Sequence, residues 1–530
     1  MQIIAENITY TFPSGKNILR DIGFSLPEGE KAAMVGDNGS GKSALLRILT
    51  GSVTPDSGTV YINERHWTIP QHFGQYDCCT IGQVLRVQDK IDALREIENG
   101  SADPRHFDVL ADDWAINERL QAALEQWNLP GYVSGTPFSF LSGGEKTRTL
   151  LAGITVHQPQ LVLMDEPTNH LDTSGRELLG RFIRESTCDF LIVSHDRELL
   201  NLCNPIYELS SLGIRKYGGN YAFYQEQKQM EMEAVEQRIR HTKQSIADAK
   251  RKYRETMERK QKLNARGEKK AKKGGLPRIV LNAARNRAES STAKLSNVHE
   301  HKIEEERERL QELKNRQREL KDIRITLSDS VLHKGKVLFK ADRINYAFGY
   351  NDPLWEEPLN FVIQSGDRIH ITGDNGSGKS TLIRLLNREI NPTAGTLTIQ
   401  SERRFILDQE YRLIDREATV LEQAVALNKA NRPDHQLKTL LHRHLFEEKV
   451  WDQPCKSLSG GEMMRLSLCC LALQTEQPDT IVLDEPTNNL DLRNIGILAE
   501  AISDYQGTLI VVSHDKQFVE EIGVGKTIAL

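Results

Sequence analysis

The sequence has no apolar run long enough to cross a membrane and no CxxC pair of cysteines, although Cys78–Cys79 and Cys469–Cys470 are neighbours. Of the 530 residues, 38% are hydrophobic, and the longest apolar runs, such as LIVV at 509–512, have the length of a β-strand. The seven cysteines include no CxxC pair, which excludes the usual zinc or thiol-redox spacing and predicts reduced thiols. The opening MQIIAENITYTF lacks the basic-then-apolar order of a secretory signal. These absences predict a cytoplasmic protein without a membrane span of its own.

Aromatic residues are absent from 254–338, and acidic residues are scarce in part of the same segment. Residues 251–300 hold 15 Lys and Arg but only 5 Asp and Glu, although the whole chain carries a formal charge of −5. Because the positive charge is so concentrated, we expect an anionic partner for this segment rather than for the whole surface. A chain of 530 residues also exceeds the size of a single core, which predicts two or three domains.

Four short motifs occur twice in the same order, and they organise the chain. GDNGSGKS stands at 36–43 and 373–380, LSGGE at 141–145 and 458–462, DEPTN at 165–169 and 484–488, and SHD at 194–196 and 513–515. Such a repeat indicates a duplicated unit of about 200 residues. It predicts one domain at 1–224, a second at 335–530, and a separate linker at 225–334.

Each copy has the pattern of an α/β domain. In KAAMVGDNGSGKSALLRIL a strand, a glycine-rich turn and a helix follow one another, and QLVLMDEP and DFLIVSHD indicate short buried strands that end in polar residues. Apolar strands that alternate with helices predict a largely parallel sheet covered on both faces. We therefore predict two α/β domains of the phosphate-loop type.

The repeated glycine-rich motif has the form GxxxxGKS of a phosphate-binding loop. Its glycines let backbone N–H groups approach phosphates, and the following helix N-terminus favours negative charge. We expect Lys42 and Lys379 to reach the β- and γ-phosphates of ATP, and Ser43 and Ser380 to ligate Mg²⁺. The other predicted contacts of the two loops are Gly36, Asn38, Gly39, Gly41, Gly373, Asn375, Gly376 and Gly378.

Acidic residues and a histidine follow the apolar strands of each copy. In the first copy Asp165 ends a strand, where its carboxylate suits the outer shell of Mg²⁺, and Glu166 is predicted to polarise an attacking water. His195 follows the next strand and is predicted to contact the γ-phosphate. The second copy repeats this metal-binding and catalytic set as Asp484, Glu485 and His514.

Phosphate loop, LSGGE, Asp-Glu and His in this order resemble the nucleotide-binding domains of ATP-binding cassette (ABC) proteins. The resemblance covers both copies and implies that Gln71 and Gln409 contact the metal and the attacking water. It also implies that Phe12 and Phe348 stack on adenine, with Tyr10 and Tyr346 near enough to be alternatives.

The same resemblance implies two ATP molecules held between facing cassettes. Each site then pairs the phosphate loop of one copy with the LSGGE of the other, whose hydroxyl and amide donors suit a γ-phosphate. Lys42 is implied to share its ATP with Ser459, Gly460 and Gly461, and Lys379 with Ser142, Gly143 and Gly144. Since both copies retain every residue of these sets, both sites are predicted to hydrolyse ATP in a cycle of closure and opening.

Finer features resemble the F subfamily (ABC-F), twin-cassette ATPases that act on the ribosome. These features are LSGGEKTRTLLA, DEPTNHLD, and YGGNYAFYQEQ at 217–227. The departures are small: Asn489 stands where the first copy has His170, and Ala44 replaces the usual Thr after Ser43. Within the subfamily, a general translation factor and a protector against ribosome-targeting antibiotics stay open as alternatives.

The first copy carries extra chain between its glutamine and its LSGGE. Gln71 and Ser142 are 71 positions apart, whereas Gln409 and Ser459 are 50 apart, and the excess includes ADPRHFDVLADDW. Some members of the resembled subfamily insert a ribosome-touching arm here. An ordinary surface loop is the alternative.

The linker contains two charged helical runs, at about 225–263 and 298–325. Apolar residues recur at three- and four-residue steps, such as Val235 and Ile239 in the first run and Leu310 and Leu313 in the second. Pro277, after two glycines, breaks the pattern between them. This arrangement predicts an antiparallel helical hairpin that reaches on the order of 59 Å, with a basic tip near 264–290.

The basic tip is predicted to bind RNA. Without aromatic side chains it cannot stack on bases, so we expect contacts to backbone phosphates. The predicted contacts are Lys269, Lys270, Lys272, Lys273, Arg278, Arg285 and Arg287.

By resemblance, the partners of this tip are transfer RNA and ribosomal RNA. The sequence thus predicts a monomeric, ATP-hydrolysing, ribosome-associated factor. The ATPase of a transporter with separate membrane subunits and a DNA-repair ATPase are the alternatives.

Overall fold

The computed structural model describes residues 1–12, 15, 17–210, 213–273, 290, 297, 301–314, 332–333, 335–349 and 352–530. The chain divides into two compact units: Met1–Ala222 with Ile323–Leu530, and Phe223–Asp322. No helix among the described residues combines the length and the apolar character of a membrane span. All seven cysteines are free, as their spacing predicts.

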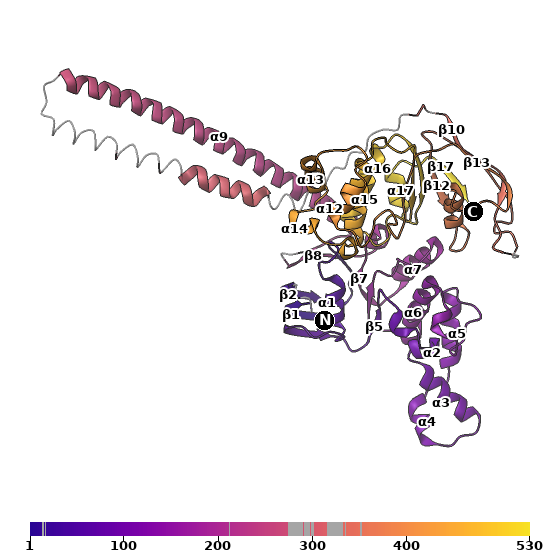
Figure 1. The fold of residues 1–530 in the computed structure, drawn as a ribbon. Helices are drawn as coiled ribbons and strands as arrows, with labels where there is room; N and C mark the ends of the chain where they lie inside the picture. Colours follow the sequence, from indigo (N-terminus) through magenta and orange to yellow (C-terminus); the bar gives the residue numbers. More distant parts are fainter. Residues whose placement is uncertain are drawn as a thin grey trace. The chain divides into compact units, whose positions relative to one another are not determined.

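The first unit contains two α/β cassettes (Figure 1), which share the order of their core strands and of the helices that follow the repeated motifs. The strands of the first cassette are β1 (Ile3–Thr11), β2 (Asn17–Leu26), β3 (Lys31–Val35), β4 (Ser57–Ile62), β5 (His66–Ile69), β6 (Leu161–Asp165), β7 (Asp189–Val193), β8 (Ile206–Ser210) and β9 (Gly213–Tyr217). Its helices are α1 (Lys42–Leu49), α2 (Ile81–Val84), α3 (Gln88–Glu98), α4 (Pro104–Leu110), α5 (Ile116–Gln126), α6 (Gly143–His157), α7 (Thr173–Glu185) and α8 (Arg197–Asn201), with 3₁₀ turns η1 (Gly74–Tyr76) and η2 (Phe138–Phe140).

The second cassette repeats the first with a shorter helical region. Its strands are β10 (Val337–Asn345), β11 (Leu359–Gln364), β12 (Arg368–Thr372), β13 (Ala394–Ile399), β14 (Arg404–Leu407), β15 (Thr480–Asp484), β16 (Thr508–Val512) and β17 (Lys526–Ala529). Its helices are α11 (Lys379–Leu386), α12 (Val420–Ala426), α13 (Asp434–Arg443), α14 (Glu448–Trp451), α15 (Gly460–Ala472), α16 (Leu492–Asp504) and α17 (Lys516–Glu521), with the 3₁₀ turn η3 (Cys455–Ser457).

Each cassette combines a parallel core sheet with a small antiparallel sheet. The core sheets have the orders β5-β6-β7-β3-β8-β9 and β14-β15-β16-β12-β17, and all neighbours except β8 and β9 are parallel. The antiparallel sheets are β2-β1-β4 and β11-β10-β13. This arrangement confirms the predicted α/β class.

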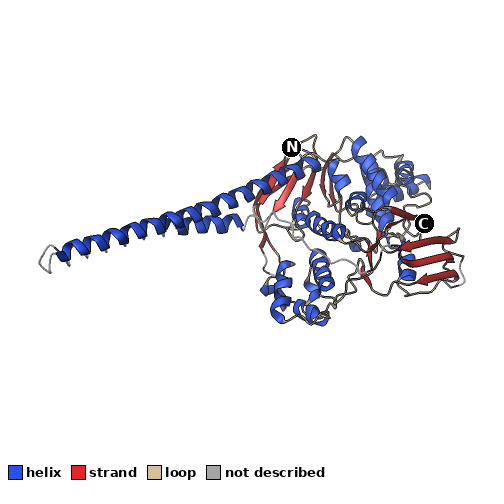
Figure 2. Cartoon of the chain, turned by 90° about the horizontal axis from the view of Figure 1, so that it is seen from above, coloured by secondary structure: helices blue, strands red, loops and turns tan. Residues whose placement is uncertain are grey.

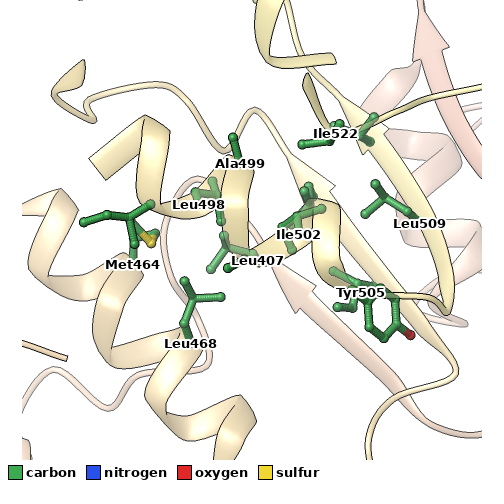
Figure 3. Close-up of a cluster of buried hydrophobic side chains, with 14 of the residues drawn as sticks. Leu407, Met464, Leu468, Leu498, Ala499, Ile502, Tyr505, Leu509 and Ile522 are labelled. Atoms are coloured by element: carbon green, nitrogen blue, oxygen red, sulfur yellow. The ribbon is translucent and has the colours of Figure 1, made fainter. Parts of the chain in front are cut away.

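The predicted apolar strands are buried because helices cover them. Every residue of β6, β7 and β16 is buried, as expected for parallel strands enclosed on both faces. In the second cassette, side chains of α15 and α16 pack with Leu407, Tyr505 and Leu509 in one buried cluster (Figure 3). This core fixes the strand ends that carry the motif residues.

The extra chain of the first cassette is helical rather than an irregular loop. It forms α3 and α4, which pack on each other and form a projection that the second cassette does not repeat (Figure 1). Phe107 and Trp114, which come from the polar and aromatic stretch, stay exposed on it and contact each other at a ring separation of 6.3 Å.

The second unit contains α9 (Tyr221–Lys273), a helix of 53 residues and therefore about 80 Å long. Val235, Ile239 and Ile246 are buried along it, as the predicted apolar stripe requires. Residues 301–314 form a second helix that runs beside α9 in both views (Figures 1 and 2). The helix continues to Lys273, beyond the helical run expected at about 225–263, and residues 274–289 of the expected tip lie outside the described residues.

Candidate active site

The two GxxxxGKS motifs form the turn between a core strand and a helix, as predicted. Gly41 has φ +100°, and a Cβ there would lie 2.6 Å from Ile18 Cγ2 and 2.8 Å from Leu19 Cδ2. Gly378 in the second loop has φ +96° and faces the same restriction. Only glycine fits this left-handed turn without strain, so the loop backbone can begin a helix at the following lysine.

Both loop lysines fold back over their own loops. Lys42 Nζ donates to the carbonyl oxygens of Gly36 at 2.6 Å and Asp37 at 3.1 Å, and Lys379 donates to the corresponding carbonyls at 2.7 and 3.0 Å. Burial lowers the pKa of Lys42 from its usual range, against the attraction of nearby carboxylates. A buried cation at a helix N-terminus is suited to an anionic ligand.

A cavity of about 330 Å³ lies over the first phosphate loop and is closed from the other side by the second cassette. The first cassette contributes the predicted residues Phe12, Asn38, Gly39, Gly41, Lys42, Ser43, Gln71, Asp165, Glu166 and His195. The second cassette contributes Ser459, Asn489, Leu490 and Asp515. The cavity therefore combines one phosphate loop with the LSGGE serine of the other copy.

The second cassette also bonds directly to the first phosphate loop. The backbone N–H of Asn38 donates to Asp491 Oδ2 at 2.8 Å, and Asn38 Nδ2 donates to the carbonyl of Asn489 at 2.9 Å. Asp37 pairs with Arg493 at 3.6 Å. The segment that follows DEPTN in one copy thus holds the loop of the other copy.

The glycines of the second LSGGE do not line the first cavity, whereas Ser459 does. Gly460 is half-buried and Gly461 is buried, and a Cβ on Gly461 would meet Asn494 Nδ2 at 2.2 Å. Ser459 begins α15, and its hydroxyl accepts from Glu462 N–H in a capping box. Ser142 begins α6 in the same way.

At the second nucleotide site, the loop and the opposite motif approach through Asn375. A Cβ on Gly144 would lie 4.0 Å from Asn375 Nδ2. Gln409 is exposed there, whereas Gln71 is half-buried in the first site. The two sites are therefore built from the same residues but differ in their surroundings.

The chemistry of Ser43 and Asp165 fits a hard divalent cation. Ser43 hydrogen-bonds to Asp165, whose Oδ1 is buried and has no partner within the described part of the chain. Burial raises the pKa of Asp165 and, to about 6, that of Asp484. A hydroxyl and one carboxylate are the few protein oxygens that Mg²⁺ needs when phosphates supply others.

The catalytic candidates form one pair in each cassette. His195 Nε2 lies 3.4 Å from Glu166 Oε1, and His514 Nε2 lies 3.3 Å from Glu485 Oε1. Each histidine backbone N–H also donates to its glutamate. Both glutamates have positive φ, 49° and 48°, an uncommon conformation that turns them away from the strand direction.

The pKa values of these groups are displaced by burial. Burial raises the pKa of Glu166 to about 8, opposed mainly by Lys42, and that of Glu485 to about 7, opposed mainly by Arg176 of the other cassette. Burial lowers the pKa of His514 to about 4 and that of His195 well below its usual range. Carboxyls and neutral imidazoles displaced in this way are typical of catalytic sites.

The predicted adenine-stacking residues are accessible in both cassettes. Phe12 and Phe348 are exposed, and each contacts its neighbouring tyrosine edge-on, Tyr10 at 5.7 Å and Tyr346 at 5.0 Å. Only Phe12 lines the cavity described above.

The predicted RNA contacts are placed only in part. Lys269, Lys270, Lys272 and Lys273 belong to the last turns of α9, and Lys269 is exposed. Arg278, Arg285 and Arg287 lie outside the described residues. The four lysines are thus carried on a helix rather than on a loop.

Sequence reasoning missed two site residues, Thr173 and Arg176, on α7 of the first cassette. Thr173 contacts His514, and Arg176 lines the first cavity beside Glu166. Aligning the copies at Asp172 and Asp491 could have drawn attention to them, because the second copy has different residue types at both positions.

Comparison with known proteins agrees with this geometry. The family described as ABC transporter matches residues 19–169 and 357–488. ABC transporter F family member 5 of Arabidopsis thaliana is 30% identical over 552 residues, covering 98% of this chain and 73% of that protein. The probable ATP-binding protein YbiT of Escherichia coli O157:H7 is 30% identical over 541 residues, covering 98% and 94%.

A solved structure shares the arrangement of the fold. The archaeal ribosome recycling factor aABCE1, in complex with the archaeal ribosomal stalk protein aP1, has a TM-score of 0.59 and 18% identity, covering 99% of this chain and 87% of that one. This likeness concerns the fold alone. Twin cassettes, their motifs and the F-family relatives together establish that the chain belongs to the ABC-F family of ATP-binding cassette proteins and is an ATPase.

Proposed function

We propose that this protein is a ribosome-associated translation factor that uses ATP to insert and withdraw the helical linker. The observation that carries the proposal is α9, a charged helix of 53 residues that follows the first cassette and precedes the second in the sequence and carries a cluster of lysines near its end. This long charged helix argues against the alternative, the ATPase of a transporter. The fold neighbour aABCE1 is described as a ribosome recycling factor, which supports the same class of target.

Each cassette binds one ATP in this proposal. Lys42 and the loop N–H groups hold the phosphates at the first site while Ser459 closes it from the opposite cassette, and Lys379 and Ser142 do the same at the second. Ser43, Gln71 and Asp165, and likewise Ser380, Gln409 and Asp484, would hold Mg²⁺, which supplies charge neutralisation at the phosphates. Phe12 and Phe348 stack on the adenines.

Hydrolysis then depends on the glutamate–histidine pairs. Glu166 and Glu485 orient and accept a proton from the attacking water, and the neighbouring His195 and His514 contact the γ-phosphate. Closure requires both ATP molecules, because each site is completed only by the facing cassette. Loss of the γ-phosphate releases the contact and lets the cassettes open.

The lysines at the end of α9 bind RNA backbone phosphates in the ribosome. Lys269, Lys270, Lys272 and Lys273 lie within five positions of one another, and Arg278, Arg285 and Arg287 follow along the chain. Binding of this kind depends on salt and not on base identity. We also propose, as the narrower role, that the linker protects the ribosome from an antibiotic.

Sedimentation of a hydrolysis-deficient variant tests the proposal. With Glu166→Gln and Glu485→Gln, ATP should hold the closed state, and the protein should pellet with ribosomes through a sucrose cushion only when ATP is present. Replacing the four lysines by alanine should reduce the slope of log affinity against log salt by up to about 3, since each phosphate contact contributes roughly 0.7–0.9.

A matched control uses four lysines earlier on the same helix, Lys250, Lys252, Lys260 and Lys262, replaced together by alanine. Their loss should leave ribosome binding and its salt dependence within twofold of the unchanged linker. ATP-independent sedimentation, or equal losses for both lysine sets, contradicts the proposal. Resistance is checked separately, by comparing antibiotic susceptibility of cells expressing the native chain or the four-lysine variant.

A further inference from the structure

The segments that follow DEPTN differ between the two cassettes at the positions that face the opposite site. Counting from Asp172 and Asp491, Thr173 corresponds to Leu492, and Arg176 corresponds to Ile495. The first cassette therefore offers a hydroxyl and a cation, where the second offers two aliphatic side chains. The motif residues do not reveal this difference between the two cassettes, because both copies have every motif residue.

The hydroxyl of Thr173 reaches the catalytic histidine of the second site. Thr173 Oγ1 lies 3.1 Å from His514 Nδ1, across the contact between the cassettes. The other ring nitrogen, Nε2, lies 3.3 Å from Glu485 Oε1. The hydroxyl of Thr173 can donate to Nδ1 or accept from it, so this bond orients the imidazole ring in either tautomer.

The equivalent histidine of the first site lacks this support. His195 Nε2 lies 3.4 Å from Glu166 Oε1, but Nδ1 is buried and has no hydrogen-bond partner within the described part of the chain. Leu492, at the position corresponding to Thr173, cannot donate a hydrogen bond. The ring of His195 is therefore not oriented by a bond at Nδ1 within the described part of the chain.

Arg176 adds a second difference on the same helix. Its Nη1 donates to Asp196 at 2.9 Å and its Nε donates to the carbonyl of Leu171 at 3.2 Å, which hold the guanidinium in place. Ile495, at the corresponding position of the second cassette, cannot make such bonds.

We propose that Thr173 is a positioning residue for hydrolysis at the second nucleotide site, and that the two sites of this chain hydrolyse ATP at different rates. The hydroxyl holds the ring of His514 in place through Nδ1, while the first site, without such a bond, is the slower one. The inference rests on the roles given above to Glu485 and His514. It concerns the ATPase reaction and does not depend on ribosome binding.

Single-site backgrounds test the inference. Glu166→Gln leaves hydrolysis to the second site, and Glu485→Gln leaves it to the first; hydrolysis of ATP is measured at saturating MgATP without ribosomes. In the Glu166→Gln background, Thr173→Val should lower kcat about three- to tenfold, as one lost hydrogen bond of roughly 0.5–1.5 kcal/mol allows. KM should change less than twofold, and Thr173→Ser should restore kcat.

Two comparisons separate this role from a structural one. The loss caused by Thr173→Val should be at least threefold larger in the Glu166→Gln background than in the Glu485→Gln background. Ser174→Ala, which removes a hydroxyl bonded to Asp172 of its own cassette, should leave kcat unchanged in both. Leu492→Thr should raise kcat in the Glu485→Gln background.

Equal losses in the two backgrounds, or no rescue by serine, overturn the positioning role. If Glu485→Gln alone leaves turnover intact, the glutamate assignment of the proposed function fails instead. The ATPase rates of Glu166→Gln and Glu485→Gln alone are therefore measured before any threonine variant is made in them.

Discussion

Replacing Gly153 by alanine tests how tightly the LSGGE helix packs on the sheet of the first cassette. Gly153 lies in α6, and a Cβ there would come within 2.3 Å of Trp67 Cζ2 and 2.6 Å of Trp67 Cε2 on β5. The indole cannot move away easily, because it is 7% exposed and its Nε1 donates to the carbonyl of Leu150 at 2.9 Å. Alanine therefore creates an overlap that the native chain avoids.

Two opposed effects set the change in the free energy of unfolding that Gly153→Ala causes. Alanine is favoured over glycine in a helix interior by about 1 kcal/mol. Overpacking of a filled core costs about 1–3 kcal/mol or more, and a contact this short falls at the upper end. We therefore expect Gly153→Ala to lower the free energy of unfolding by about 2 kcal/mol. For a domain of this size that corresponds to a drop in Tm of about 4–8 °C.

The second cassette suggests the compensating change. At the positions of Trp67 and Gly153 it has Phe405 and Cys470, a smaller ring opposite a larger residue. Thermal unfolding of the two single variants and of Trp67→Phe with Gly153→Ala forms a double-mutant cycle. The double variant should be at least about 1 kcal/mol more stable than the sum of the single effects.

The result that would refute this reasoning is a stabilised Gly153→Ala. A gain of about 1 kcal/mol would mean that helix propensity acts alone and that the indole moves freely. Additive single effects would mean that the ring and the glycine are not coupled. Because β5 leads to Gln71 and α6 begins beside Ser142, the same variants show whether this packing also affects ATP turnover.

Two further predictions concern stability. Burial holds the pKa of His444 below its usual range, so the unfolded chain takes up a proton first as the pH falls through about 6.5, and the folded state loses stability there. Between pH 7.5 and 5.5, the free energy of unfolding measured in urea should fall by about 1 kcal/mol less for His444→Leu than for the native chain. The control His435→Leu replaces an exposed histidine and should follow the native curve. Asp491 and Asp172 each cap a helix, and Asp491 also accepts a hydrogen bond from the backbone N–H of Asn38 in the other cassette. Asp491→Ala should therefore lower the free energy of unfolding, measured by calorimetry, by about 1 kcal/mol more than Asp172→Ala. Equal losses would contradict a stabilising contribution from that bond.

The sequence by itself determined the architecture of the cassettes and the identity of the family. Four duplicated motifs, read with the apolar strands before them, predicted two α/β cassettes, and the structure and the relatives confirm both. These features are local: a glycine-rich turn, a strand end and a helix start are each encoded by a few neighbouring residues. The domain limits 1–224, 225–334 and 335–530 stay predictions.

The linker shows where local patterns stop being sufficient. Helical periodicity identified α9 and its apolar stripe, but the end of the helix was placed too early. Lysines and alanines between 265 and 273 favour helix as much as a basic loop, the single Gly267 does not end the helix, and the adjacent pair Gly274–Gly275 comes only after Lys273. Charge pattern indicates that this segment has an anionic partner, whichever backbone carries it.

Only the tertiary structure decided how the two copies meet. The bond from Thr173 to His514 joins residues 341 positions apart, and that from Asn38 to Asp491 joins residues 453 apart. No periodicity encodes such contacts, since they depend on which faces of two folded cassettes come together. For the same physical reason, only the folded chain shows that Nδ1 of His195 is buried without a hydrogen-bond partner in the described residues. The difference between two sites with identical motifs likewise appears only in the folded chain.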